Sequence, residues 1–335
     1  MALYIIRRLV SLGFVLLGLT ILVFMIARLL PGDPVALAAG PNASPAEIAA
    51  YGREFGLDRP YLTQYLSYLG GLFRGDFGVS IYTRRPVSED LAAYLPATLE
   101  LVVAAMALAI LIGIPAGLIS AVYRNLWPDY LSRALALGAI SMPRFFLGLL
   151  LQLGVALALG WLPLAGRYPL IEDPPKFLTG FLTIDALWAG DIGAFVLALK
   201  HLALPAIAMS LSPLATITRM MRASVIETLQ QDYVLTERAL GLSRQLILLK
   251  YVLRNSLSAT LTVIGLYFGW LLGGTVLVET VFDWPGIGLY ATKAIVTQDF
   301  MPVMGVTLCI GTMFVLMNLV IDLLYGVINP KVRYE

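Results

Sequence analysis

The sequence predicts an all-α, polytopic membrane protein with six transmembrane helices. Of its 335 residues, 59% are hydrophobic and only 13% are charged, whereas average soluble domains are about 45–50% apolar and about 25% charged. A soluble core cannot absorb that much apolar surface, so the composition indicates the lipid bilayer as a partner. The net charge of +2 gives no basic field for nucleic acid. The single cysteine, Cys309, excludes a disulfide framework or a thiolate metal site built from this chain alone.

Six stretches are long and apolar enough to cross a bilayer, which takes about 20 such residues in a helix because lipid offers the backbone no hydrogen-bond partners. They are residues 9–30, 99–122, 134–159, 202–221, 256–278 and 302–328. The first stretch is longer than the apolar region of roughly 7–15 residues found in a signal peptide. We therefore expect a retained membrane anchor there.

Basic residues in the short loops set the expected orientation, because such residues favour the cytoplasmic side. Arg7 and Arg8 precede the first span. Six crossings then place on the same side Arg124, Arg133, Arg222, Arg238, Arg244, Lys250, Arg254, Lys331 and Arg333. Both termini are therefore expected in the cytoplasm.

This orientation divides the chain into a first helix, an external layer and a five-helix core. The three parts are residues 1–30, 31–97 and 98–335, and the core contains an external loop at 160–200 and a cytoplasmic loop at 223–255. The 31–97 segment carries both signs of charge, but a loop of over about 60 residues translocates largely regardless of charge. Glu100 and Glu279 are expected at outer helix ends, in contact with water.

The cytoplasmic loop 223–255 is too polar to span a membrane and too long for a simple connector. Asp232 in the first turn and Arg238 near the end suit the dipole of a short helix over 232–240. Gly241 stops this helix, and Ser243 can cap a second one.

The first of these helices has an apolar side made by Leu235, Ala239 and Leu242. On a cytoplasmic surface, such a side is expected to dock into a groove of another protein. The alternative is an amphipathic helix that rests on lipid headgroups.

At this point the sequence resembles a known family. Residues 231–243, QDYVLTERALGLS, are similar to the coupling loop (EAA motif) of ABC importer permeases, and YVLRNSL at 251–257 is similar to its continuation in the dipeptide, oligopeptide and nickel branch. The match is imperfect, because Leu-Thr-Glu at 235–237 occupies the Glu-Ala-Ala positions and Arg254 stands where the general motif has proline. Similar segments in the same order are LPGDP at 30–34, FGLDRP at 55–60, GDFG at 75–78, SMP at 141–143, GWLP at 160–163, ETVFDWPGIG at 279–288 and DLLYGVINP at 322–330.

The resemblance implies a type I ABC importer permease fold and a transport subunit, not an enzyme, in the inner membrane. It implies import of dipeptides or oligopeptides, with nickel complexes, glutathione, opines and sugars left open as substrates. The implied partners are a second homologous permease, two ATP-binding subunits and an external solute-binding protein, with no cofactor in this chain. The residues that it implies for coupling to the ATPase are Asp232, Tyr233, Leu235, Glu237, Arg238, Ala239, Gly241 and Leu242. In agreement, none of the five lysines is followed by Ser or Thr, so the chain has no phosphate-binding loop of the Gly-x-x-x-x-Gly-Lys-Ser/Thr type.

A proton-coupled secondary transporter is the alternative function. Such a protein takes its energy from titratable groups near the bilayer midplane, and Asp322 lies near the cytoplasmic end instead. It would also have no need of the segment 232–255. A membrane enzyme is disfavoured because the sequence offers no constellation of nucleophile, base and metal ligands.

Within the spans, Arg144 follows Met142 and Pro143 in the third predicted helix. A charge at midspan costs about 2.5–3.5 kcal/mol on insertion scales and usually faces a cavity or a partner. One hypothesis is that Arg144, with Met142 and Pro143, lines the substrate pathway and attracts an anionic group such as a peptide carboxylate. The alternative is a structural ion pair, or a helix bent at Pro143 that lifts the charge toward water.

Small residues recur every four positions in the fifth span, at Gly265, Gly269 and Gly273. Such spacing allows close approach of helix backbones. We expect packing within the subunit or against the second permease, and pore lining is the alternative. His201, the single histidine, is expected to be a satisfied residue at the membrane interface.

Overall fold

The computed structural model describes residues 2–29, 44–54, 58–176 and 178–328. These residues form helices joined by turns, with one isolated antiparallel bridge between Val79 and Pro86 and no strand among them. The predicted all-α class is confirmed. The motifs at 30–34 and 55–57, and the basic residues after 328, lie outside the described residues.

Four of the described helices are long and apolar enough to cross a membrane. They are α5 (Val87–Val122), α9 (Ile192–Leu229), the continuous helix Arg244–Gly274, and α15 (Phe300–Ile328) over Phe300–Ile321. A bent helix pair raises the number to five, and α1 (Ala2–Leu29) contains the shorter apolar stretch Val10–Ile26. The count of six spans stays a prediction.

The third predicted span, 134–159, is broken rather than straight. Helix α6 (Trp127–Ser141) ends before Met142, and α7 (Arg144–Leu151) continues as the π-helix η1 (Gln152–Ala158). The two arms meet at 103°. Met142 is extended (φ −102°, ψ 132°) because the ring of a proline disfavours helical angles in the residue before it.

Two further helices are longer than the sequence predicted. Helix α5 begins at Val87, twelve residues before the predicted start at 99. Helix α9 runs for 38 residues, opens with the Asp191 side chain accepting a hydrogen bond from the Ala194 amide (2.9 Å), and continues through Pro205 and Pro213. Hydropathy detects only the apolar middle of such helices, so their polar ends were missed.

The contacts group the described residues into two units. The first comprises Met1–Ala97 and Pro285–Met313, with α1, α3 (Pro45–Glu54), α4 (Tyr61–Leu72), α14 (Ile287–Val296) and parts of α5 and α15. One of its cores joins α5, α14 and α15, and consists of Val87, Leu91, Ile287, Tyr290, Ala291 and Val306. Another joins α1 and α15 through Val23, Phe24, Met304 and Leu308, and α4 covers it.

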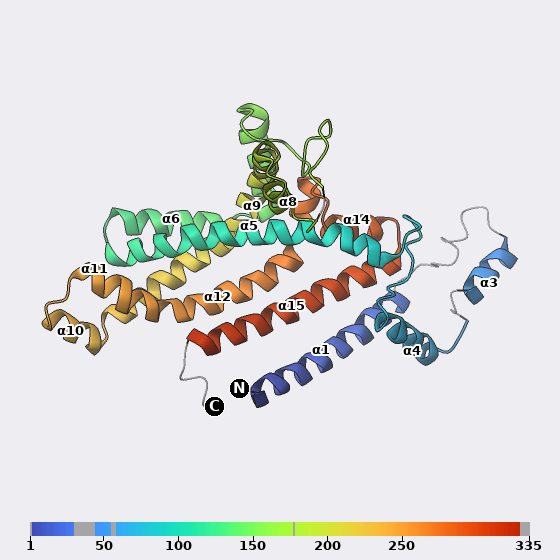
Figure 1. The fold of residues 1–335 in the computed structure, drawn as a ribbon, viewed down its shortest axis with the longest axis horizontal. Coiled ribbons are helices and arrows are strands. Elements are labelled where there is room, and N and C mark those ends of the chain that lie inside the picture. The colour runs from blue at the N-terminus through green and yellow to red at the C-terminus, as the bar shows by residue number, and fades with distance from the viewer. Residues whose placement is uncertain (1, 30–43, 55–57, 177, 329–335) are drawn as a thin grey trace. The chain divides into compact units, whose positions relative to one another are not determined.

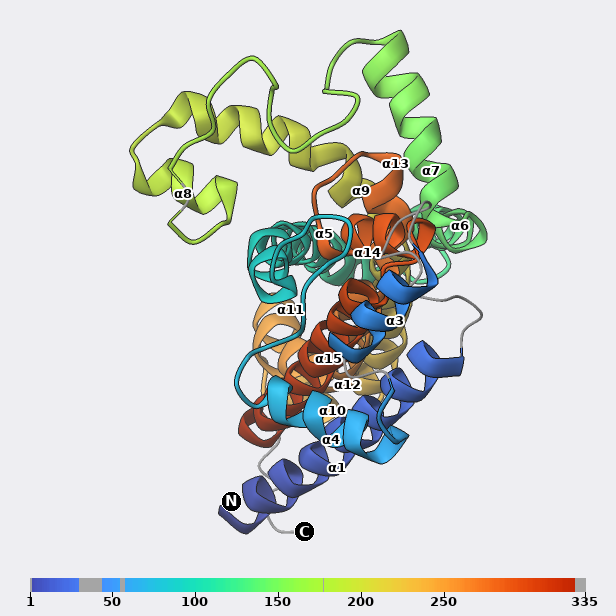
Figure 2. The ribbon, with the colours of Figure 1, turned by 90° about the vertical axis from the view of Figure 1, so that its right-hand side faces the viewer.

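The second unit comprises Thr98–Trp284 and Phe314–Glu335. Helix α9 is central to it, because α6, α7, α8 (Leu182–Trp188) and α12 (Leu253–Gly274) all pack on this helix. Figure 2 shows α8 beside the first turns of α9. Helices α10 (Asp232–Ala239) and α11 (Arg244–Leu246) connect the end of α9 to α12, through the π-helix η2 (Ile247–Val252) (Figure 1).

Candidate functional site

The predicted cytoplasmic segment folds as two short helices around a glycine. Helix α10 ends at Ala239, and Leu240 still has helical angles (φ −74°, ψ 0°). Gly241 then takes φ +77°, a left-handed conformation that glycine adopts without a Cβ clash. Ser243 caps the next helix, because its hydroxyl accepts a hydrogen bond from the Leu246 amide (3.4 Å). The predicted helix, glycine stop and serine cap are confirmed.

This segment, residues 231–249, is hereafter the coupling segment, and it packs tightly on the ends of two long helices. A buried cluster joins α5, α9, α10 and η2, and consists of Ala121, Met221, Val225, Val234, Ile247 and Val252. Two hydrogen bonds support it nearby: Asn255 Nδ2 donates to Tyr233 Oη (2.8 Å), and Ser256 Oγ donates to Thr228 Oγ1 (3.1 Å). The coupling segment and the ends of α5 and α9 therefore share one buried cluster.

Several leucines of the coupling segment are exposed. Leu235 is 56% exposed and Leu240 is 71% exposed. Leu246 and Leu249 are also exposed. Leu235 and Leu240 lie on or beside α10, where exposed leucines suit contact with a partner protein, whereas Leu246 and Leu249 belong to the helix Arg244–Gly274, which is apolar enough to cross a membrane.

The predicted apolar side, Leu235, Ala239 and Leu242, is divided between two roles. Leu235 and Ala239 are exposed, as a docking surface requires. Leu242 instead packs against the buried cluster. The anchor of α10 is Val234, which is fully buried and which the sequence analysis missed because a single short helix does not reveal which side meets the spans.

A buried ion pair fixes the same ends of the spans. Arg222, predicted only as an anchor to the cytoplasmic side, donates to both carboxylate oxygens of Asp129, from Nε (2.7 Å) and Nη2 (2.8 Å). Asp129 is fully buried and also accepts from Ser120 Oγ (2.7 Å) and the Asn125 amide (2.9 Å). The pair thus joins the end of α5, the start of α6 and the end of α9. The only sequence clue to this pair was the position of Asp129 between the basic residues Arg124 and Arg133.

The break between α6 and α7 places Arg144 at the first position of α7. Arg144 is half-buried, and its Nη1 atom occupies space that a Cβ at Gly274 would need, 2.7 Å away. On the same helix α12, Tyr267 Oη is hydrogen-bonded to Thr216 Oγ1 (2.9 Å). Within the described part of the chain, no carboxylate forms an ion pair with Arg144.

The two other predicted pathway residues flank this break. Met142 is extended and 46% exposed, and Pro143 is the N-cap of α7. The helix bent at Pro143 is thus observed. The guanidinium group of Arg144 therefore lies next to Gly274 of α12, close to the bend.

The glycines of the fifth span do not share one environment. A Cβ at Gly265 would lie 2.5 Å from Ile321 Cδ1, and one at Gly269 would lie 2.5 Å from Phe314 Cδ2, so both glycines admit side chains of α15. A Cβ at Gly273 would meet no atom within 4 Å. Packing within the subunit accounts for the first two positions, and Gly273 leaves an open surface.

The two external glutamates are buried, contrary to the expectation that they touch water. Glu279 is fully buried and accepts from Thr98 Oγ1 (2.7 Å). Glu100 is 5% exposed; it pairs with Arg167 (Nη2 to Oε2, 2.5 Å) and accepts from the Thr183 amide (2.8 Å). The Arg167 guanidinium also lies 5.8 Å from the centre of the Trp284 ring, within cation–π range. The loop at 160–200 therefore covers these helix ends, which hydropathy alone could not show.

Two further polar groups in or next to this loop, Asp185 of α8 and His201 of α9, are satisfied. Burial of Asp185 would raise the pKa of its carboxyl, but hydrogen bonds from the Thr179 amide and hydroxyl and from the Leu178 and Gly180 amides outweigh this and lower the pKa. His201 Nδ1 lies 3.1 Å from the Gly166 carbonyl oxygen. His201 is thus a satisfied residue, as predicted.

Comparison with known families decides the class of protein. Residues 113–334 match the family described as binding-protein-dependent transport system inner membrane component, and residues 1–102 match the N-terminal family of the same membrane components. The chain belongs to this family. It is therefore a permease, a multi-pass component of the inner membrane that serves transport rather than catalysis.

Several relatives match this permease over nearly their full length. The dipeptide transport system permease protein of Alkalihalophilus pseudofirmus is 44% identical over 99% of both chains. The dipeptide transport system permease protein of Escherichia coli is 42% identical over 99% of both chains. The glutathione transport system permease protein of Escherichia coli is 37% identical, again over 99% of both chains.

Proposed function

We propose that this permease imports dipeptides or oligopeptides, driven by ATP that partner subunits hydrolyse. The exposed leucines of α10 and its C-cap, Leu235 and Leu240, carry this proposal, because they suit a docking surface on a segment that packs on the ends of two spans. The dipeptide permeases among its relatives support a peptide substrate. Glutathione, itself a small peptide and the substrate in the name of another relative, is the second candidate.

The proposed mechanism is mechanical. Two ATP-binding subunits dock on Leu235 and its neighbours, and their closure on ATP displaces the coupling segment. Since Val234 and Ile247 pack against α5 and α9, this displacement reorients the spans between inward and outward access. The residues assigned to this role are Asp232, Tyr233, Leu235, Glu237, Arg238, Ala239, Gly241 and Leu242.

The proposed assembly also contains a second homologous permease and an external solute-binding protein. The coupling segment and both termini face the cytoplasm, as the arginines near the ends of α5, α9 and α12 favour. Residues 31–97 and 160–200 face the outside, where the binding protein delivers the substrate. No cofactor is assigned to this chain.

The test is uptake of a radiolabelled dipeptide into proteoliposomes that contain the complete importer. Leu235→Glu should abolish ATP-dependent uptake, because it places a charge on the docking surface while leaving the buried cluster intact. Leu66→Glu is the matched control, since Leu66 is 58% exposed on α4, outside the coupling segment. Uptake driven by a proton gradient without ATP, and indifferent to Leu235→Glu, would favour the secondary transporter instead.

We further propose that Arg144, with Met142 and Pro143, lines the substrate pathway and attracts a carboxylate of the peptide. The support is a half-buried guanidinium at a helix break that has no carboxylate partner within the described chain. Such intramembrane charges usually face a cavity or a partner.

For Arg144, the informative quantity is the ratio of acidic to neutral dipeptide uptake, because the selectivity of the binding protein cancels between variants. Arg144→Gln should lower this ratio, and Arg144→Lys should preserve it. A Gln variant that takes up both dipeptides less well but in an unchanged ratio would assign Arg144 to structure.

A further inference from the structure

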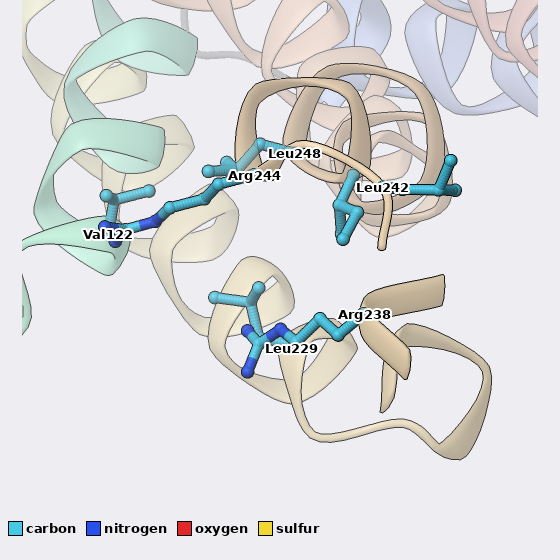
Figure 3. A pocket seen from close by; sticks show the side chains of 7 residues that line it. Val122, Leu229, Arg238, Leu242, Arg244 and Leu248 are labelled. Carbon is cyan, nitrogen blue, oxygen red and sulfur yellow. The ribbon is translucent and has the colours of Figure 1, made fainter. Parts of the chain in front are cut away.

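A pocket of about 440 Å³ lies between the coupling segment and the ends of α5 and α9. Its walls are Val122, Leu229, Arg238, Leu242, Arg244, Ile247 and Leu248. Figure 3 shows the Arg244 side chain directed toward Val122 and the Arg238 side chain directed toward Leu229. Two cations thus share a pocket whose other walls are apolar.

This arrangement calls for an anion. Neither Arg238 nor Arg244 forms an ion pair with a carboxylate of the described chain. Both arginines are exposed, so an anion that enters the pocket from outside can reach their charges. Guanidinium groups bind phosphate with two parallel hydrogen bonds, so a phosphate is the anion that best fits this pair.

The depth of the pocket indicates where the phosphate comes from. Val122 is the last residue of α5, and the aromatic residues Tyr123, Trp127 and Tyr130 that follow it are 49%, 75% and 58% exposed. Exposed Trp and Tyr near the end of a span mark the headgroup level of a bilayer. Phospholipid headgroups are therefore the phosphates at hand.

The remaining walls suit the rest of a lipid. Val122, Leu229, Leu242 and Ile247 offer an apolar surface to the glycerol and the first methylenes of an acyl chain. The volume lies within the roughly 300–1,000 Å³ of small-molecule sites. A zwitterionic headgroup would bring its ammonium group toward the two arginines, which favours an anionic headgroup.

We propose that this pocket binds the headgroup of an anionic membrane phospholipid, with Arg238 and Arg244 on its phosphate. The lipid would connect α10 and α11 to the ends of α5 and α9. The membrane's content of anionic lipid would then set how firmly the coupling segment is held. Only this last consequence rests on the proposed function; lipid binding does not.

The test uses the full chain in its native complex, in nanodiscs, with photoreactive phosphatidylglycerol as the probe. Light should attach the probe to residues 238–248, and Arg244→Gln should reduce labelling about fivefold, as expected for one basic residue at an anionic surface. Arg244→Lys should retain most of the labelling. Arg254→Gln is the matched control, because Arg254 is an exposed arginine near the pocket that does not line it.

The other occupants give different results. Equal labelling by photoreactive phosphatidylcholine, or an equal loss with Arg254→Gln, would overturn the proposal. If inorganic phosphate at constant ionic strength protects residues 238–248 from the probe, the pocket is a free phosphate site rather than a lipid site. If Arg244→Gln releases the ATP-binding subunits in every lipid while labelling is unchanged, Arg244 binds a protein and the proposal is wrong. Labelling needs no ATP and no substrate, so its failure leaves the importer function untouched.

Discussion

The ion pair between Asp129 and Arg222 should contribute strongly to the stability of the ends of α5 and α9. Replacing Asp129 with alanine removes the acceptor of four hydrogen bonds, two from Arg222 and one each from Ser120 and Asn125. It also leaves the Arg222 guanidinium, which is 21% exposed, without its counterion. Breaking a buried pair in this way costs about 3–5 kcal/mol, and the partial exposure of Arg222 favours the lower end.

A double-mutant cycle measures this cost. The unfolding free energies of Asp129→Ala, Arg222→Ala and the double variant are compared in mixed micelles with increasing denaturing detergent. Because the pair is absent from both single variants, the double variant should lose much less than the sum of their losses. Arg219→Ala is the matched control, since Arg219 is exposed on the same helix; it should change stability by less than about 0.5 kcal/mol. Additive losses, or single variants as stable as the control, would refute the reasoning.

Three further outcomes follow from the structure. Gly117→Ala places a Cβ 2.6 Å from the Thr218 carbonyl oxygen, whereas the Cβ of Gly138→Ala meets no atom within 4 Å. In the same detergent titration, Gly117→Ala should lower the free energy of unfolding by about 1–3 kcal/mol. Equal stabilities of the two variants would contradict the packing of α5 on α9. Gly241→Val should reduce ATP-dependent uptake with membrane insertion intact, because φ +77° costs a residue with a Cβ about 1–2 kcal/mol. Gly241→Asn should reduce uptake less, and equal uptake by both variants would show that the left-handed conformation of residue 241 is not required. Because the pKa of Asp185 is lowered, its contribution to stability is fully present above the ordinary carboxyl pKa of about 3.9 and is lost as the pH falls through the lowered value. Hydrogen exchange of the amides at 178–180, corrected for intrinsic rates, should therefore accelerate in acid. An unchanged exchange rate in Asp185→Asn at neutral pH would contradict this reasoning.

Features that depend on a few neighbouring residues could be predicted from the sequence. Gly241 and Ser243 act on the backbone within one turn, so the stop and the cap of the coupling helices were evident. Pro143 acts on Met142 directly, so a bend was foreseeable there. Four of the six predicted spans correspond to helices that are long and apolar enough to cross a membrane, because length and hydropathy are properties of the local sequence.

Features that depend on which helices are neighbours could not be predicted. Asp129 and Arg222 are 93 positions apart, and nothing in either local pattern selects the other. The burial of Glu100 follows from Arg167 in a loop that reads as exposed and polar. In α10, Val234 and Leu235 are equally hydrophobic, and only the position of α9 and η2 decides which is buried and which is exposed.

Helix α9 is long enough to extend beyond both faces of the membrane core. At 38 residues it is about 57 Å long, nearly twice the roughly 30 Å of a hydrocarbon core. Its first turns contact α8 and its last turns hold Val225 in the cluster of the coupling segment. A tilt of α9 would therefore displace its two ends at the same time and in opposite directions. Pro205 and Pro213 are the positions at which α9 can bend, and the stiffness of the helix there determines how much of a displacement at one end reaches the other end.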